Sequence, residues 1–352
     1  MSISELLTIT NEIPLETSFS AQLQSIRQRE TKGGKPYLEW TIADSTGNLT
    51  LKVWNNHPQF GSATEAPLES LFRLSGQWTQ NQYGIDGKGW KFRLLTEEEK
   101  TEFLAGDPHI RAKQNHDWAD LVDFVNQLAD PRLKDLCLLF IEQFEDRFRR
   151  TAAARKNHHA RRGGLVEHVA QMMRSAEAIC GVYPELNRDL IIAGILFHDC
   201  GKLWENTYPE NGFNQLQLLH GEMLGHIPLG LELVNKLWRN LPLDGWHELE
   251  PASEEVRLHL RHLIASHHGQ YDFGSPTLPR TPEAHALHYI DNLDAKLEMV
   301  KDAYAKANES APGIFERQFP LPAPLVTPLP PVAAKEAEEA PETPKPPSEE
   351  LF

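Results

Sequence analysis

The first hundred residues alternate hydrophobic and polar side chains, which is the period of a half-buried β-strand. Four segments show this alternation: Phe19-Ala21-Leu23, Leu38-Trp40-Ile42, Leu49-Leu51-Val53 and Trp90-Phe92-Leu94. Lys32-Gly33-Gly34-Lys35 and Asp44-Ser45-Thr46-Gly47 lie between strands and are typical turn sequences. We therefore expect about five short strands over residues 1–100.

After a connecting segment at residues 96–113, the hydrophobic spacing changes to three or four residues, the period of an α-helix. Pro131 interrupts the first of these helices. Leu190 to Phe197 is an unbroken apolar run, which predicts a buried helix that ends at His198 and Asp199. The pattern indicates a helical domain over residues 112–310.

Two later helices are expected from their start signals. Ser253 precedes a stripe of apolar residues that leads to His267, and we expect its side chain to cap that helix. Thr281-Pro282-Glu283 is a typical helix start, and Asp291 follows on the same helix.

Proline, alanine and glutamate dominate the chain beyond Pro320, and they leave too little apolar surface to form a core. We expect residues 320–352 to be a disordered acidic tail, and we favour a solubilising role over partner binding. The tail contributes to a net charge of −15, which is unfavourable for a nucleic-acid-binding protein unless basic groups are concentrated locally.

The length of 352 residues and the hydrophobic content of 40% suffice for two folded cores. No apolar run approaches the roughly 20 residues that span a bilayer, and none at the N-terminus resembles a signal peptide. The 3 cysteines lack metal-type spacing, and their odd number argues against a disulfide framework. We expect a cytoplasmic protein with no membrane association.

About five short strands with glycine-containing connections fit a small Greek-key barrel of the OB type. Such barrels bind single-stranded nucleic acid by stacking bases on aromatic rings and steering the backbone with basic groups. Trp40 and Trp90 are interpreted as core residues. The candidates for substrate binding in this domain are Lys32, Lys35, Tyr37, Lys52 and Trp54.

Histidines are concentrated in the helical domain: of the 16, only His57, His109 and His116 lie outside residues 158–288. Imidazole and carboxylate ligands together suit Mn²⁺, Fe²⁺, Co²⁺ or Zn²⁺. The set is larger than one four-coordinate ion needs, which indicates two cations and hydrolysis of a phosphate ester. Its members are His168, His198, Asp199, His226, His267, His268 and Asp291.

The order of these residues resembles the HD-domain superfamily of metal-dependent phosphohydrolases. The surrounding motifs resemble one branch of it, the YhaM-type 3′→5′ exoribonucleases, which join an OB-fold to an HD domain. These motifs are Asn157-His158-His159-Ala160, Gly163-Gly164-Leu165, His198-Asp199-Cys200-Gly201-Lys202, Gly225-His226, Ser266-His267-His268-Gly269, Gly274-Ser275-Pro276 and the run from His288 to Lys296. The resemblance extends from about residue 15 to about residue 305. Thr151-Ala152-Ala153-Ala154 departs from it, because the family usually has a proline-containing segment there.

The resemblance implies a metal centre, with Asp199 as the bridging ligand because its position matches the family's His-Asp pair. Two ions are expected; Mn²⁺ is favoured, and Fe²⁺ or Co²⁺ fits the same ligands. His268 is either a further ligand or a hydrogen-bond donor to the phosphate, and Asp294 is the alternative to Asp291. The implied ligands are His168, His198, Asp199, His226, His267 and Asp291.

The expected reaction is attack of a metal-activated water on the terminal phosphodiester of single-stranded RNA, with DNA as a second substrate, which releases nucleoside 5′-monophosphates. The RNA preference and the 3′→5′ direction come from the resemblance alone. Lys202 is expected to neutralise charge in the transition state. The alternatives are a phosphohydrolase of nucleotides or cyclic dinucleotides, and a non-catalytic nucleic-acid-binding protein.

A run of basic residues precedes His168, and we expect these residues to bind phosphates of the substrate. Its members are Arg147, Arg149, Arg150, Arg155, Lys156, Arg161 and Arg162. His158 and His159 are further candidates for contact with the substrate or for proton donation to the leaving oxygen, with support of the ligands as the alternative.

Overall fold

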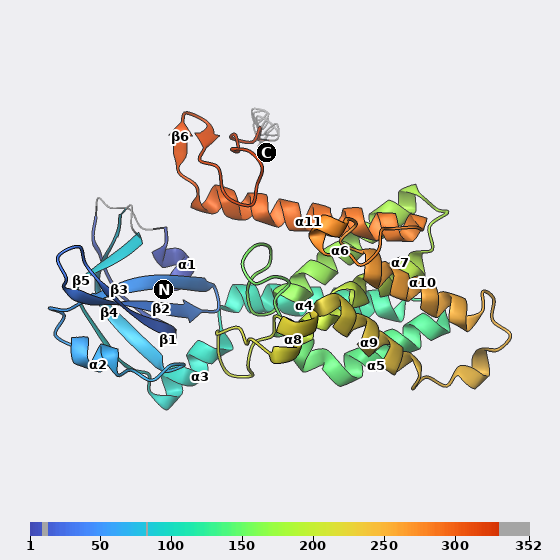
Figure 1. The fold of residues 1–352 in the computed structure, drawn as a ribbon, viewed down its shortest axis with the longest axis horizontal. Helices are drawn as coiled ribbons and strands as arrows, with labels where there is room; N and C mark the ends of the chain where they lie inside the picture. The colour runs from blue at the N-terminus through green and yellow to red at the C-terminus, as the bar shows by residue number, and fades with distance from the viewer. Residues whose placement is uncertain (9–12, 82–83, 331–352) are drawn as a thin grey trace, which may run out of the picture. The chain divides into compact units, whose positions relative to one another are not determined.

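The computed structural model describes residues 1–8, 13–81 and 84–330, and the chain divides into two compact units, Met1–Met299 and Val300–Phe352. In the first unit a β-sheet comes first and helices follow (Figure 1). This order confirms the predicted fold class. Among the helices of the described ranges, none is long and apolar enough to cross a membrane.

Five strands form one antiparallel sheet in the order β3-β2-β1-β4-β5. They are β1 (Leu15–Glu30), β2 (Pro36–Asp44), β3 (Gly47–Trp54), β4 (Leu71–Asn81) and β5 (Gly84–Leu94). The first half of β1 pairs with β4 and its second half with β2, and a register shift follows Leu23. β3 also contacts β5, so the sheet curls into the expected OB-like barrel.

The inner face of the barrel holds the alternating hydrophobic residues, and Trp40 and Trp90 are both buried as expected. Two short helices, α1 (Ile3–Leu6) and α2 (Phe60–Thr64), add to this core. Leu94 departs from the expected alternation, because β5 ends there: Leu94 is exposed and Leu95 is buried instead.

The connecting segment at residues 96–113 is mostly helical, a structure that its polar composition did not predict. It contains α3 (Glu97–Ala105) and the start of α4 (Pro108–Asn126). Thr96 and Glu99 form a reciprocal capping box at the start of α3, and the Asp107 side chain caps α4. These caps satisfy helix N–H groups that would otherwise have no partner.

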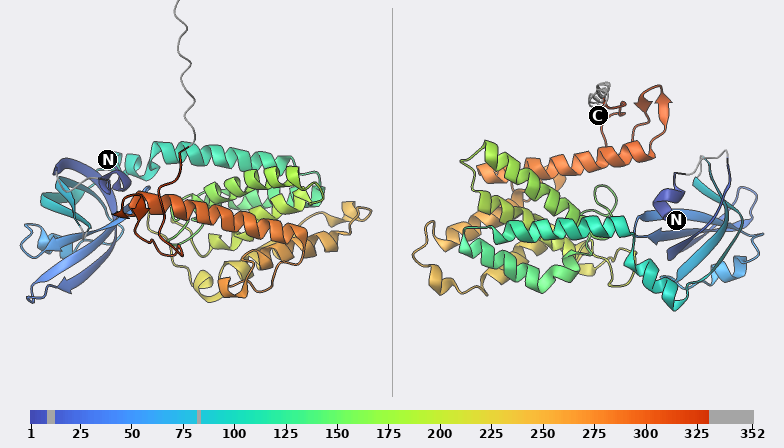
Figure 2. Two further views of the ribbon diagram at one scale, coloured as in Figure 1. Left: turned by 90° about the horizontal axis from the view of Figure 1, so that it is seen from above. Right: turned by 180° about the vertical axis from the view of Figure 1, so that it is seen from behind.

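The remaining helices, of which the last extends beyond Met299, form a bundle around a second hydrophobic core (Figure 2). They are α5 (Pro131–Phe148), α6 (Gly164–Val182), α7 (Arg188–His198), η1 (Cys200–Leu203), α8 (Leu219–Leu224), α9 (His226–Trp238), η2 (Leu243–Trp246), α10 (Ser253–Ser266), η3 (Tyr271–Phe273) and α11 (Pro282–Lys306). The predicted buried helix is α7, in which every residue from Leu190 to His198 is buried. One expected cap is wrong: Ser253 is the first helical residue, and Ala252 occupies the cap position without a side-chain hydrogen bond.

The second unit contains a small hairpin of β6 (Glu309–Ala311) and β7 (Ile314–Phe315). Val326 forms an isolated bridge with Ile314, and its carbonyl accepts a hydrogen bond from the Tyr304 hydroxyl at 2.6 Å. The first residues of the expected tail are therefore held by the hairpin rather than disordered. Residues 331–352 of the expected tail lie outside the described residues.

Candidate metal centre

Most of the predicted metal ligands lie at the ends of helices. His198 ends α7, Asp199 links that helix to η1, His226 starts α9, and His267 follows the last residue of α10. Gly201 permits this arrangement, because a Cβ atom there would lie 1.9 Å from the His226 carbonyl oxygen.

In four of the candidate histidines, one ring nitrogen is held by a hydrogen bond to a fixed acceptor. The Nδ1 atoms of His198 and His267 donate to backbone carbonyls of the preceding turn, at 2.7 and 2.8 Å. Nδ1 of His226 donates to Glu205 at 2.8 Å, and Nδ1 of His268 donates to the Phe273 carbonyl at 2.6 Å. Each Nε2 is then left with the lone pair that a metal ligand needs.

The Nε2 atoms of His198, His226 and His267 converge on Asp199, which is almost fully buried. Oδ2 of Asp199 lies 3.2 Å from Nε2 of His198, whereas Oδ1 lies 3.5 Å from Nε2 of His226 and 3.7 Å from Nε2 of His267. The two carboxylate oxygens therefore face two groups of imidazoles. Despite burial, which opposes ionisation, the charges of Lys202 and His198 hold the pKa of Asp199 well below its usual range.

His168 lies between two carboxylates. Its Nε2 is 3.3 Å from Asp291, and its Nδ1 is 2.7 Å from Asp294. Burial lowers the pKa of His168, but these two carboxylates outweigh it and raise the pKa to about 9. Asp291 is on the side of the other candidate ligands, and Asp294 is on the opposite side of the ring. This geometry favours Asp291 as the ligand and gives Asp294 the role of orienting His168.

The donor set fits a divalent cation, because buried atoms with lone pairs converge without partners. Buried polar atoms are normally hydrogen-bonded, and a cation satisfies such a cluster. Within the described ranges the side-chain atoms of the cluster that lack a hydrogen-bond partner are Nε2 of His168, His198, His226 and His267 and Oδ1 of Asp199. Among the described residues, four groups of mutually close ligand atoms result: His168-His198-Asp291, His198-Asp199-His267, His226-His267-His268 and His159-His168-Asp294.

Known proteins supply independent evidence for the family. A family model of the HD domain matches residues 165–296. The 3′-5′ exoribonuclease YhaM of Geobacillus sp. (strain WCH70) is 32% identical over 300 residues, which cover 84% of this chain and 86% of that protein. The chain belongs to the YhaM family. The resemblance inferred from the motifs is thereby confirmed.

Solved structures that resemble parts of this YhaM-family chain include two of replication protein A. The second OB-fold domain of the protein from Methanococcus maripaludis is 19% identical and covers 28% of this chain and 95% of that chain, with a TM-score of 0.21. A heterotrimer bound to single-stranded DNA is 17% identical and covers 29% of this chain and 84% of that chain, with a TM-score of 0.23. These scores are too low to carry an argument, so the barrel is defined by its own strand order.

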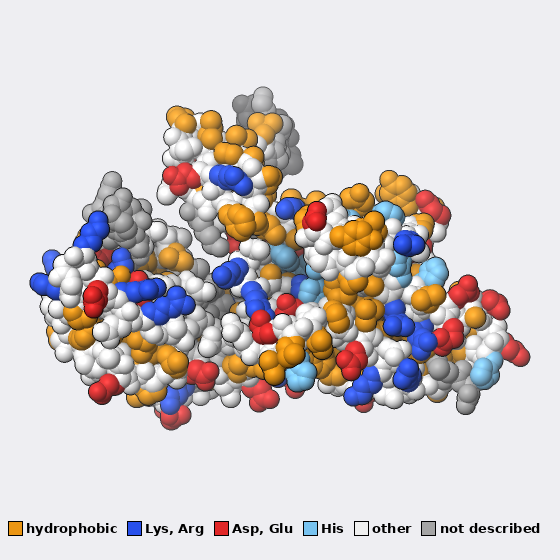
Figure 3. All heavy atoms as spheres, in the orientation of Figure 1, with side chains coloured by type: hydrophobic (Ala, Val, Ile, Leu, Met, Phe, Trp, Pro, Cys, Tyr) orange, Lys and Arg blue, Asp and Glu red, His pale blue; other side chains and the backbone are white. Residues whose placement is uncertain are grey.

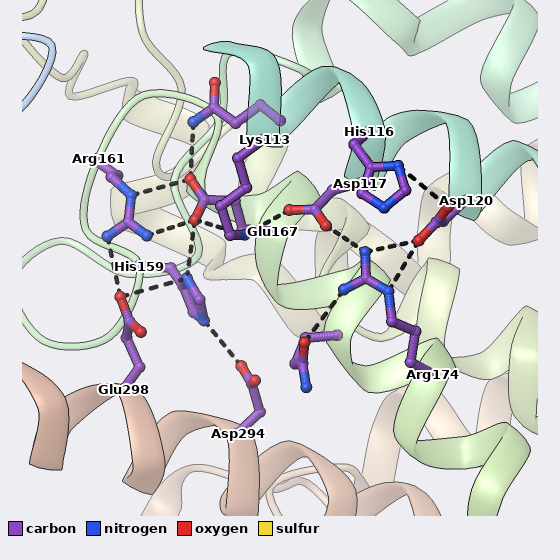
Figure 4. A network of polar contacts seen from close by, with 12 residues as sticks. Lys113, His116, Asp117, Asp120, His159, Arg161, Glu167, Arg174, Asp294 and Glu298 are labelled. Carbon is purple, nitrogen blue, oxygen red and sulfur yellow. Dashed lines mark hydrogen bonds and ion pairs between the residues drawn. The ribbon is translucent and has the colours of Figure 1, made fainter. Parts of the chain in front are cut away.

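Asp294, which bonds His168, belongs to a charged network in this YhaM-family chain (Figure 4). His159 donates from Nε2 to Asp294 at 3.0 Å, and its ring also lies between Glu167 and Glu298. Arg161 bonds both of these glutamates. His159 is 6% exposed and its ring contacts Asp294, which favours the supporting role weighed as the alternative to substrate contact.

Contact of the basic run with phosphates stays a prediction, and most members of the run bond partners within their own domain. Arg161 is bound to Glu167 and Glu298, and Arg155 bonds Asn206 and Glu222. Lys156 is exposed and remains a candidate for substrate contact. The others donate to backbone carbonyls or side chains of their own domain: Arg147 to Leu203, Arg149 to Glu145 and Asn115, Arg150 to Tyr208, and Arg162 to Pro209, Glu210 and Gly212.

A cleft of about 420 Å³ opens onto Asp199 and Asp291. Of the expected catalytic residues, Lys202 and His268 line it, and Nζ of Lys202 is 2.5 Å from Asp199. His158 lines it too, but burial and the charges of Lys202 and His168 lower the His158 pKa to about 3, which makes it a poor proton donor. Histidine atoms reach the surface beside basic and acidic side chains near α11 (Figure 3). Five further lining residues were not among the predicted site residues: Asn157, Phe273, His288, Asn292 and Lys296.

The predicted aromatic candidates of the barrel lie together on its outer face. Tyr37 and Trp54 are paired across β2 and β3, with ring centroids 5.1 Å apart. Trp54 is 40% exposed, and Nζ of Lys52 lies 5.9 Å from the centre of its ring. Lys32 and Lys35 are exposed at the β1–β2 turn. This face has the aromatic and basic groups that single-strand binding requires.

Proposed function

We propose that the protein is a metal-dependent 3′→5′ exoribonuclease that hydrolyses single-stranded RNA to nucleoside 5′-monophosphates. The observation that carries this proposal is the convergence of unpartnered imidazole nitrogens on Asp199 at the base of an open cleft. The membership of the YhaM family supports the direction and the substrate.

We propose two cations, with Mn²⁺ favoured, because the two oxygens of Asp199 face different sets of histidines. When bound, the cations supply Lewis acidity and a water of lowered pKa. The proposed ligands are His168, His198, Asp199, His226, His267 and Asp291, with His268 as a further candidate.

The remaining polar groups of the cleft bind and orient the scissile phosphate. Lys202 places a positive charge beside Asp199 and offsets negative charge that develops on the phosphate. His268 presents its Nε2 to the cleft, since its Nδ1 is fixed by the Phe273 carbonyl. The outer face of the barrel, with Tyr37, Trp54 and the nearby lysines, binds the strand upstream.

The test is hydrolysis of matched 5′-labelled single-stranded RNA and DNA in the presence of Mn²⁺. A ladder that shortens from the 3′ end, and that EDTA abolishes, is expected. Asp199→Ala should lower the rate by at least about 1,000-fold, the upper range for losing one polar group from such a site, while leaving strand binding largely intact. Asp123→Ala, at an exposed position of α4, is the matched control. Intact RNA with hydrolysed nucleotides or cyclic dinucleotides would refute the exoribonuclease assignment.

A further inference from the structure

One wall of the cleft is a single face of α11. Asp291 and Asn292, then Ala295 and Lys296, then Met299 line the cleft, and this spacing of three and four residues is that of one helix face. With a rise of about 1.5 Å per residue, Lys296 lies about 7 Å along the helix from Asp291. It is therefore beyond the candidate ligands but within the same cleft. Lys296 is exposed, and no ion pair is recorded for it among the described side chains.

Phe273 lines the same cleft. Phe273 is 57% exposed, although burial of a phenylalanine side chain is favourable. Its backbone is nevertheless fixed: its carbonyl accepts the His268 hydrogen bond at 2.6 Å, and the Gly274 N–H donates back to Tyr271 at 2.9 Å. The next residue, Ser275, is buried and donates from Oγ to the carbonyls of Ala265 and Thr277.

An exposed ring on a fixed backbone beside a phosphate-hydrolysing centre has the properties of a base-stacking platform. Bases of every type stack on aromatic side chains, so the contact tolerates any sequence. The volume of the cleft, about 420 Å³, lies within the range of pockets for small organic ligands. Lys296 adds a mobile positive charge of the kind that pairs with a backbone phosphate.

We propose that Phe273 and Lys296 form the subsite for the last two nucleotides at the 3′ end. The terminal base stacks on Phe273, and Lys296 pairs with the 5′ phosphate of the penultimate nucleotide, which is next to the scissile phosphate. This inference rests on the proposed exoribonuclease function and specifies how the strand end is recognised. Because the stacked contact does not read base identity, the protein removes nucleotides of all four types from the 3′ end.

The stacking contact is tested with two single-stranded RNA oligonucleotides that differ only at the 3′-terminal position, which carries either a normal base or no base. Removal of the base should lower kcat/KM of the wild-type protein about 10- to 100-fold, the range for losing one base-aromatic stack. Phe273→Ala should lose the same factor on the normal substrate and no longer distinguish the two. Phe273→Tyr should restore the discrimination.

The matched control is Tyr271→Ala, since Tyr271 is an exposed aromatic residue of the same short helix that does not line the cleft. It should discriminate as the wild type does. If Phe273→Ala keeps the full discrimination, or if the wild-type protein shortens both RNAs equally well, the stacking subsite is refuted and the exoribonuclease function stands. Failure of the wild-type protein to shorten either RNA would overturn both.

The contact between Lys296 and the phosphate is tested by the dependence of kcat/KM on salt concentration. Lys296→Ala should reduce the slope of log(kcat/KM) against log[salt] by about 0.7, the value for one phosphate contact with a single strand, and Lys296→Arg should keep the wild-type slope. Lys236→Ala, on an exposed face of α9 away from the cleft, is the control. An unchanged slope in Lys296→Ala would refute the role of Lys296.

Discussion

At the scale of single residues, the metal centre depends on side chains that orient the ligands as much as on the ligands themselves. Glu205 accepts the Nδ1 proton of His226 at 2.8 Å, and Asp294 does the same for His168. Each acceptor fixes the tautomer and the direction of the lone pair on Nε2. The motif that contains His198 and Asp199 gave no signal for Glu205, since the residue follows the motif in an irregular segment.

Glu205→Ala should lower the affinity for Mn²⁺ by about 10- to 100-fold, because the ring of His226 is then free to rotate. Glu205→Gln retains an acceptor and should lower the affinity less. Calorimetric titration of the metal-free protein with Mn²⁺ measures this without any assay of activity. Glu232→Ala, at an exposed position of α9, is the control. Equal affinities of Glu205→Ala and wild type would mean that His226 is not a ligand or needs no orientation.

The buried Glu167 makes the protein sensitive to acid. Burial opposes its ionisation, but bonds and charges from Arg161, Gln114 and Lys113 outweigh this and lower the pKa of Glu167 to about 2 from a usual 4.5. A lowered folded-state pKa contributes stability that is complete above pH 4.5 and is lost as the pH falls toward 2. The contribution at neutral pH is about 3 kcal/mol.

Glu167→Gln should therefore be less stable than wild type by about 3 kcal/mol at pH 7. The difference in unfolding free energy should shrink as the pH falls from 4.5 toward 2. Urea unfolding of both proteins across this range is the measurement. A difference that stays constant with pH would show that the ionised carboxylate does not stabilise the fold.

At the scale of elements, the local sequence pattern predicted the burial and the position of residues within one helix or strand. Contacts between side chains far apart in the sequence could not be predicted from it. The apolar run of α7 predicted both its burial and the place of His198. The role of Arg161 was not predictable in this way, because its partner Glu298 lies 137 residues away on α11. The cleft that Phe273 and Lys296 line is likewise formed by two segments, η3 and α11, whose shared lining no local pattern indicates.

Gly201 shows the same dependence between elements. A Cβ atom at Gly201 would lie 1.9 Å from the His226 carbonyl oxygen, so Gly201→Ala must push η1 away from α9. We expect a loss of about 1–3 kcal/mol, as for other overpacked sites, together with weaker Mn²⁺ binding. Gly181→Ala is the control, since a Cβ atom there meets open space near the end of α6. It should raise stability by up to about 1 kcal/mol. Chemical unfolding of both variants checks this; equal stabilities would contradict the close approach.

At the scale of the whole molecule, the proposed strand-binding face and the proposed metal centre belong to different folds of one chain. The barrel has an exposed pair, Tyr37 and Trp54, with Lys52 beside it, and its own core is complete without them. The helical domain has the histidine cluster and the cleft. The net charge of −15 is compatible with the proposed binding of a polyanion, because local basic and aromatic groups rather than the total charge would contact the strand.

This division predicts that Trp54→Ala affects long and short substrates differently. For a strand of about 16 nucleotides, the upper site size of an OB barrel, loss of one stacked base should raise KM about 10- to 100-fold and leave kcat unchanged. A dinucleotide is too short to reach the barrel and the metal cluster together, so its hydrolysis should be unaffected. Trp54→Phe should retain most of the affinity, and Leu94→Ala, at another exposed position of the barrel, should behave as wild type. Equal loss on both substrates would mean that Trp54 supports the fold or the cleft, since a contact made only by the upstream strand cannot alter turnover of a dinucleotide.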